Sequence, residues 1–109
     1  MKKETQERIN EEVLTMIEKF NQYVEEGHDC QVERLLTCNA YVKRYEDFDV
    51  LVSYKTQIAI IDKKTDTIYD FLRYVYGYTA TSAQHIAKFS REYGYGKYGC
   101  AKMLRYYDI

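Results

Sequence analysis

Three short apolar runs dominate the middle of the chain, at residues 50–54, 57–62 and 67–72, and short polar breaks separate them. Runs of this length that are rich in Val, Ile and Tyr are typical of β-strands. The breaks between them leave room only for tight connections, so neighbouring runs should pair antiparallel as a meander. Residues 40–45 alternate, with Tyr41 on one side and Val42 on the other, and they predict an additional strand before these three.

The segment before the runs predicts an amphipathic helix at residues 5–26. Apolar side chains recur there at the spacing of one helical face, at Ile9, Val13, Met16, Ile17, Phe20 and Val24. Thr5 is the expected N-cap and Gly27 the expected C-cap. We expect this helix to pack on the sheet, and the alternative is a helix that binds a partner or a second copy. Residues 29–38 predict a second, shorter helix, with Asp29 as its N-cap.

A further helix is expected after the runs, from Thr81 to Gly94. Thr81 and Gln84 have the spacing of a capping box, and the residues of one helical face follow at Ile86, Phe89 and Tyr93. Residues 100–107 predict a last short helix. The fold class is therefore α+β: a three- to four-stranded antiparallel meander with an N-terminal amphipathic helix and a C-terminal helix packed on it.

A chain of 109 residues fits one domain. We divide it into a helical N-terminal part at 1–38, the meander and helix at 40–93, and a tail rich in Tyr, Gly and basic residues at 94–109. Apolar residues make up 46% and charged residues 30%, as in globular rather than disordered proteins. No run approaches the roughly 20 apolar residues of a membrane span, and no secretion signal is visible. We therefore expect no membrane contact and a cytoplasmic location.

Charge is distributed unevenly along the chain. Residues 1–62 carry 8 Lys and Arg against 13 Asp and Glu, whereas residues 63–109 carry 8 against 4. The acidic first part offers a candidate partner-binding surface that we expect to be solvated, formed by Glu25, Glu26, Asp47 and Asp49. In the basic last part, cations would bind phosphates and rings would stack on bases. The candidate nucleic-acid contacts are Arg91, Lys97, Lys102, Arg105, Tyr95 and Tyr98.

The chain has three cysteines, Cys30, Cys38 and Cys100. An odd count without a secretion signal favours reduced thiols over a disulfide framework. Together with His28 they have the ligand types of a tetrahedral zinc site, but their spacing matches no common zinc finger. We therefore expect inert thiols and no cofactor, with zinc as the alternative.

No catalytic residue set stands out. Nothing marks Cys100 as an activated thiol beside His85, and the run from Gly94 to Lys97 lacks the spacing of a phosphate-binding loop. We expect no enzymatic activity. His85 is expected to pack against the sheet and hydrogen-bond a strand, and the alternative is contact with a partner.

Two patterns in the middle of the chain resemble a known family. The first is Val52-Ser53-Tyr54 with Thr56, Ile58-Ala59 and Asp62, and the second, after Tyr69, is YTATSAQHI at 78–86 with Phe89. They resemble the "SYxTxVAxxD" and "YSxTTSxHIxxF" patterns of an uncharacterised domain family found in phages and mobile elements of Gram-positive bacteria. The resemblance extends over residues 40–93. It implies a small meander with a helix and no enzymatic activity.

The resemblance implies a phage or mobile-element origin, and small proteins of that origin often block host machinery. The expected function is binding and inhibition of a host protein, most concretely an anti-CRISPR-like inhibition of a defence nuclease. The acidic surface would imitate nucleic-acid phosphates on that nuclease. The alternative is a small nucleic-acid-binding accessory protein that uses the basic, tyrosine-rich C-terminal part. Both place the protein in the host cytoplasm, as a monomer or a homodimer.

Overall fold

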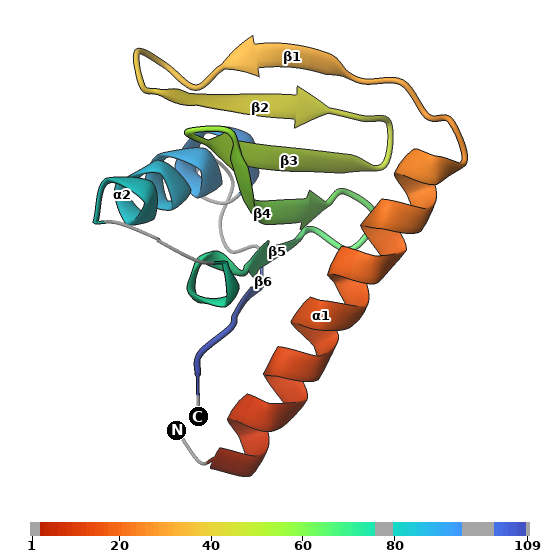
Figure 1. Ribbon diagram of the computed structural model, residues 1–109, viewed down its shortest axis with the longest axis vertical. Coiled ribbons are helices and arrows are strands. Elements are labelled where there is room, and N and C mark those ends of the chain that lie inside the picture. Colours follow the sequence, from red (N-terminus) through yellow and green to blue (C-terminus); the bar gives the residue numbers. More distant parts are fainter. Residues whose placement is uncertain (1–2, 76–79, 95–101, 109) are drawn as a thin grey trace.

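One sheet organises the molecule (Figure 1). The computed structural model describes residues 3–75, 80–94 and 102–108. Within these ranges the sheet has six strands, with a long helix against one face and a shorter helix against the other. The strands are β1 (Gln31–Arg34), β2 (Ala40–Arg44), β3 (Phe48–Ser53), β4 (Thr56–Asp62), β5 (Thr67–Asp70) and β6 (Lys102–Arg105). The helical elements are α1 (Lys3–Glu25), the 3-10 turn η1 (Leu72–Tyr74), α2 (Ala80–Phe89) and the π-helical turn η2 (Ser90–Gly94).

The strands lie side by side in chain order, from β1 to β6. Successive strands from β1 to β5 are antiparallel, and β6 is parallel to β5. The predicted meander is confirmed, since the strands expected at 40–45, 50–54, 57–62 and 67–72 appear in that order as β2 to β5. The expected count of three to four strands is too low, because β1 and β6 extend the sheet at its two sides.

Residues 29–38 do not form the predicted helix. They form β1 and a tight turn into β2, in which Leu36 has a left-handed φ of 53°. Val32, Leu35 and Leu36 have helical spacing, but only Leu35 is buried. Pairing of β1 with β2 therefore prevails over a short and weak helical pattern. The helical N-terminal part accordingly ends with α1 and does not reach residue 38.

The short helix expected at 100–107 is also wrong over its described part, since Lys102–Arg105 forms β6. Met103 packs with the core on the α2 side of the sheet, and Leu104 is buried on the α1 side. Side chains that alternate in this way fit a strand between two helical layers. Residues 100 and 101 lie outside the described residues.

α1 packs on the sheet with the predicted apolar face. The fully covered residues of that face are Val13, Met16 and Phe20. The Phe20 ring meets those of Tyr45 and Phe48 edge to face, at centroid distances of 5.3 and 5.7 Å, which is a favourable aromatic geometry. Gly27 follows the helix with a φ of 92°, as expected of a C-cap. In the described part of the chain, no helix is long and apolar enough to span a membrane.

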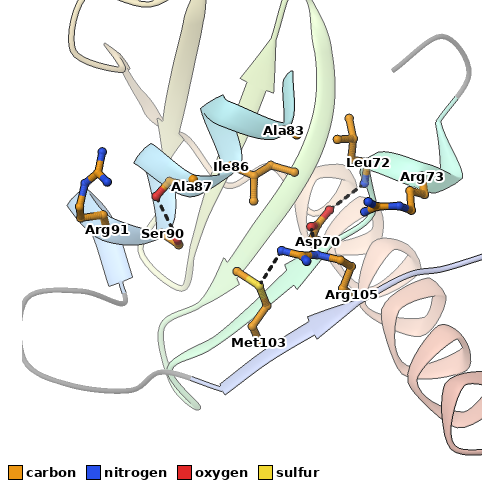
Figure 2. A pocket seen from close by; sticks show the side chains of 10 residues that line it. All are labelled: Asp70, Leu72, Arg73, Ala83, Ile86, Ala87, Ser90, Arg91, Met103 and Arg105. Atoms are coloured by element: carbon orange, nitrogen blue, oxygen red, sulfur yellow. Dashed lines mark hydrogen bonds and ion pairs between the residues drawn. The ribbon is translucent and has the colours of Figure 1, made fainter. Parts of the chain in front are cut away.

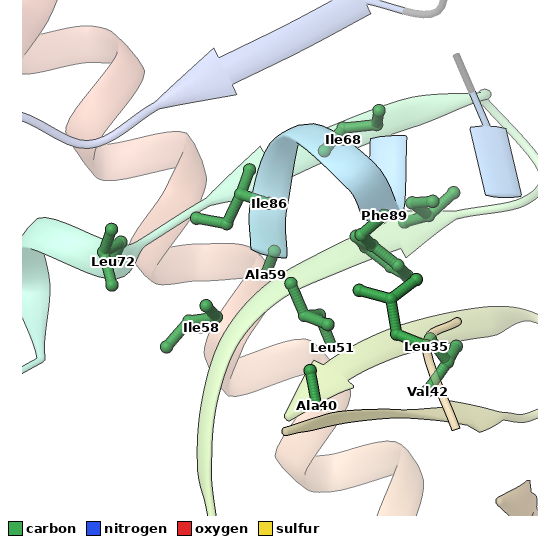
Figure 3. Close-up of a cluster of buried hydrophobic side chains, with 11 residues drawn as sticks. Leu35, Ala40, Val42, Leu51, Ile58, Ala59, Ile68, Leu72, Ile86 and Phe89 are labelled. Carbon is green, nitrogen blue, oxygen red and sulfur yellow. The ribbon is translucent and has the colours of Figure 1, made fainter. Parts of the chain in front are cut away.

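α2 covers the opposite face of the sheet and begins at Ala80, one residue before the expected start. Ile86 and Phe89 of α2 pack there on side chains of β2 to β5 (Figure 3). η2 then continues to Gly94, where the helix was expected to end. A Cβ atom at Gly94 would lie 3.0 Å from Ile61 Cδ1, so the close approach to β4 favours glycine at this position.

Candidate binding surfaces

α1 leaves part of its own sheet face open. Along β3, the side chains on this face are those of Phe48, Val50 and Val52. Tyr54 follows in the turn after β3, where it borders the open part of this face, and its ring centroid also lies 5.7 Å from that of His85 on α2. Phe48 and Val50 are buried under α1, Val52 is half-buried, and Tyr54 is 52% exposed. The cover that α1 provides therefore ends midway along β3.

We call this open region the tyrosine face. It is a hollow of about 450 Å³ lined by Val32, Asn39, Tyr41, Lys43, Val52, Tyr54 and Lys55. Val32 is 60% exposed and Tyr41 46% exposed, so apolar and aromatic groups lie in contact with solvent. Two lysines and no carboxylate belong to the lining. The tyrosine face is therefore apolar at its centre and cationic at its rim.

The turn between β3 and β4 presents Tyr54 in an unusual backbone conformation. Tyr54 and Lys55 have φ values of 51° and 83°, between the paired residues Ser53 and Thr56. Two successive positive φ values are typical of the tightest hairpin turns, where Asn and Gly are the usual residues. A tyrosine in this conformation is disfavoured by contacts of its Cβ atom. Contact of the Tyr54 ring with His85 on α2 offsets part of this cost, and 52% of the residue stays exposed to solvent.

Behind this turn, a buried polar cluster joins α2 to β3. The Oγ atom of Ser53 lies 2.7 Å from Nδ1 of His85 and 3.0 Å from Oγ of Ser82. Burial, followed by the charge of Lys88, lowers the pKa of His85. The expectation that His85 packs on the sheet and hydrogen-bonds a strand is confirmed. All three side chains are buried, so Ser53 Oγ is out of reach of a substrate and the cluster holds α2 on the sheet.

The acidic candidates do not share one environment. Asp49 lies within β3 and is buried, which corrects the expectation that it is solvated in a turn. Its Oδ1 atom lies 3.3 Å from Arg44 Nε and 3.1 Å from Lys63 Nζ. Asp47 is partly exposed, with Lys64 Nζ at 3.6 Å. The other two candidates are exposed at and after the end of α1: Glu25 and Glu26.

A second hollow, which we call the arginine groove, lies between α2, η1 and β6 and has a volume of about 410 Å³ (Figure 2). Its lining includes Asp70, Arg73, Arg91 and Arg105. Arg105 Nε donates to Asp70 Oδ2 at 2.7 Å, and its other nitrogens donate to Tyr107 Oη and Met103 Sδ. Arg73 lies over the Tyr107 ring, 4.7 Å from its centroid.

The nucleic-acid candidates are thus only partly brought together. Arg91 and Arg105 line the same groove, but Figure 2 shows Arg91 extending away from the pair of Arg105 and Asp70. Because its donors are engaged within the protein, Arg105 has a structural role. Lys102 is exposed on β6. The remaining candidates, Lys97, Tyr95 and Tyr98, lie outside the described residues.

The zinc candidates are separated by the sheet. Cys30 packs against the core on the α1 side, and Cys38 packs against the core on the α2 side, where Lys88 Nζ lies 3.4 Å from its sulfur. The His28 ring stacks on Tyr23 with a centroid distance of 3.7 Å. Over residues 3–75, 80–94 and 102–108, no group of three His, Cys, Asp or Glu side chains is arranged to hold a metal ion. Cys100 lies outside these ranges.

Comparison with protein-family models, curated proteins and solved structures finds no match to this chain. The resemblance to a phage domain family therefore stays a prediction, and functional inference has to rest on the surfaces themselves. None of the residues that line the tyrosine face was among the candidate site residues predicted from the sequence. The alternation of residues 40–45 places Tyr41 and Lys43 on one side, but it does not tell whether a helix covers that side.

Proposed function

We propose that this chain is a protein-binding module that engages its partner through the tyrosine face. The observation that carries the proposal is the exposure of Val32, Tyr41 and Tyr54 around one hollow of a sheet face that is elsewhere covered by α1. Tyrosine rings bury a large area while fixing few rotatable bonds, and they are enriched at the centres of protein interfaces. The left-handed conformation of Tyr54 adds support, since unfavourable backbone angles often persist where a residue serves binding.

The lining of the tyrosine face favours a partner with acidic groups. Lys43 and Lys55 lie at the rim, and the lining contains no carboxylate that would neutralise them. Carboxylates around an apolar spot on the partner would complement this pattern. A host protein, most concretely a defence nuclease, is the partner that the sequence resemblance suggests. Imitation of phosphates by the acidic candidates has less support, because Asp49 is buried and paired with two cations.

Tyr54→Asn tests the proposal with a change that should not harm the fold. Asn tolerates a left-handed φ better than Tyr does, and this gain opposes the loss of the ring contact with His85, so the free energy of unfolding should change by no more than about 1 kcal/mol. The partner, captured from host lysate with tagged protein and identified by mass spectrometry, should bind this variant about tenfold or more weakly. Biolayer interferometry measures the affinity, and thermal unfolding measures the stability.

Tyr74→Asn is the matched control, because Tyr74 has the same 52% exposure and lies on η1, outside the lining of the tyrosine face. This control should leave affinity unchanged. Equal affinities for both variants would overturn the proposal. Loss of binding only after reversal of Glu25, Glu26 and Asp47 to Lys would instead favour the acidic surface.

A small nucleic-acid-binding protein is the second candidate, and the arginine groove favours it. Arg73 and Arg91 both line the groove, and neither forms an ion pair with a described carboxylate. Under this candidate, nuclease treatment of the lysate would abolish capture, and Arg73→Ala with Arg91→Ala would remove a salt-sensitive affinity for labelled single strands. Tyr54→Asn would have no effect, so the same variants separate the two candidates.

A further inference from the structure

The two edges of the sheet differ in whether other parts of the chain cover them. On the β6 side, Gln6 Nε2 of α1 donates to the carbonyl oxygen of Arg105 at 2.9 Å, and Asn10 Nδ2 donates to that of Tyr107 at 2.7 Å. The N–H of Tyr107 in turn donates to Asn10 Oδ1 at 3.1 Å. On the other side, all four residues of β1 are exposed. One edge of the sheet is thus occupied by side chains, and the other is open to solvent.

The open edge presents backbone groups that can pair with another strand. The Leu35 N–H donates to the Ala40 carbonyl oxygen at 2.9 Å, which places Leu35 among the residues that bond to β2. Bonded and outward-facing positions alternate along an antiparallel strand, so Glu33 also faces β2, whereas Val32 and Arg34 face outward. By this alternation, the N–H and C=O groups of Val32 and Arg34 point away from β2 and toward solvent. An edge of this kind is a template for an added strand.

We propose that the partner adds an extended, acidic segment to β1, alongside the tyrosine face. The inference rests on the proposed function, since Val32 belongs to both the open edge and the lining of that face. In the register of β1 with β2, Arg34 lies opposite Tyr41 and Val32 opposite Lys43, so both β1 side chains are on the tyrosine side. An added strand would therefore place an apolar residue beside Val32 and acidic residues near the rim lysines and Arg34. The Arg34 guanidinium already donates to the carbonyl oxygens of Thr37 and Cys38, so the lysines supply most of the free positive charge.

The same charges disfavour a second copy of this chain as the occupant. Two β1 strands related by a two-fold axis would bring both tyrosine faces to the same side of one continuous sheet. That side would then carry Arg34, Lys43 and Lys55 from each copy, and the lining supplies no carboxylate to balance them. Like charges side by side on a sheet are unfavourable. An acidic segment of another protein relieves this repulsion, whereas self-association increases it.

The test uses a fluorescent peptide of about seven residues with the sequence Thr-Glu-Thr-Val-Thr-Glu-Thr. In an extended strand, one side of this peptide carries Glu, Val and Glu, and the other side carries Thr. We expect saturable binding to the full chain with a Kd below about 1 mM, measured by fluorescence anisotropy. A peptide with Lys in place of both Glu residues should bind about tenfold or more weakly. A peptide with N-methyl groups on the backbone nitrogens that face β1 should do the same, because it cannot donate to the edge.

Val32→Pro tests the edge from the protein side. Proline is tolerated where a strand N–H faces solvent, so the fold should persist, while binding should weaken about tenfold or more. Val32→Thr keeps the N–H and should bind better than Val32→Pro. Should Val32→Pro fail to fold, the N-methylated peptide tests the same bonds with unchanged protein.

The possible results separate this inference from the proposed function. Suppose that Tyr54→Asn binds more weakly, while Val32→Pro and the N-methylated peptide bind fully. This result would overturn the added strand and support binding through the tyrosine face. The reverse pattern would keep the added strand and overturn the tyrosine face. No binding at about 1 mM peptide would overturn the inference. It would also be overturned by a dimer of this chain, seen by light scattering, that Val32→Pro dissociates.

Discussion

Asp49 illustrates how the environment of one residue depends on its neighbour. It lies in the acidic run Glu46-Asp47-Phe48-Asp49, which suggests a solvated turn, yet its side chain is buried. Phe48 explains the difference, because its ring belongs to the core under α1 and β3 begins there. The next residue must face the other side of the sheet, next to Arg44 on β2. A buried carboxylate persists at such a site only when cations and hydrogen bonds replace its water.

We expect Asp49→Asn to lower the free energy of unfolding by about 2–3 kcal/mol. The change removes the negative charge between Arg44 and Lys63, and partial exposure of these cations keeps the loss below that of a fully buried pair. Asp47→Asn is the control, because Asp47 pairs with the highly exposed Lys64 and the loss of stability should stay within about 0.5 kcal/mol. Urea unfolding followed by circular dichroism measures both. Equal losses would contradict the buried placement of Asp49.

Among the elements, β6 depends most on contacts from far along the chain. It pairs with β5, and two side chains of α1 hold its C-terminal end: Gln6 bonds to Arg105, and Asn10 bonds to Tyr107 just beyond the strand. These two side chains also bond to each other, with Gln6 Nε2 donating to Asn10 Oδ1 at 2.7 Å. Both are buried although they are polar. The first turns of α1 thus serve as the outer partner that β6 would otherwise lack.

Asn10→Ala should therefore loosen the C-terminal edge. It removes both hydrogen bonds to the exposed Tyr107 and takes the Oδ1 acceptor from the buried Gln6 side chain, so stability should fall by about 1–2 kcal/mol. Amide hydrogen exchange at residues 102–107 should accelerate more than exchange in β3 and β4. Asn21→Ala, at an exposed position of the same helix, should change neither quantity measurably. Unchanged exchange at residues 102–107 in Asn10→Ala would show that the hydrogen bonds from Asn10 do not hold β6 in place.

At the scale of the whole molecule, one sheet has a hydrophobic core on each of its two faces. β3 and β4 contribute residues to the cluster under α1 and to the cluster under α2. Loss of either helix would expose one face of the same strands, so we expect the cores to unfold together. α2 is also held by the buried contact of His85 with Ser53, and this contact makes the stability of the molecule depend on pH.

The chain has two histidines, and only His85 is buried. Because burial and Lys88 lower the pKa of His85 below its usual value of 6.5, the unfolded chain binds a proton more readily than the folded chain. Stability is therefore fully present above about pH 7 and should fall as pH drops through about 6, by at most about 1.4 kcal/mol per pH unit. His85→Asn should flatten this slope, and His28→Asn should keep it. Urea unfolding between pH 5 and 8 measures the slopes, and parallel curves for His85→Asn and wild type would refute the assignment.

The amino-acid sequence by itself determined the elements with long, regular patterns. The apolar stripe of α1, the runs that form β2 to β5 and the apolar side of α2 all appear where local periodicity places them. The packing of His85 on a strand also follows from its place on the inner side of α2.

Only the tertiary structure decided the elements with short patterns and the exposure of individual side chains. β1 and β6 form because a neighbouring strand offers hydrogen bonds that outweigh a weak helical preference. Asp49 is buried and Tyr41 is exposed although both lie in strands of similar pattern. Tyr41 is exposed because α1 leaves the part of its sheet face over β1 and β2 open, whereas Asp49 lies on the opposite face, beside Arg44 and Lys63. The position of that helix is a property of the packed molecule, and no local stretch of residues encodes it.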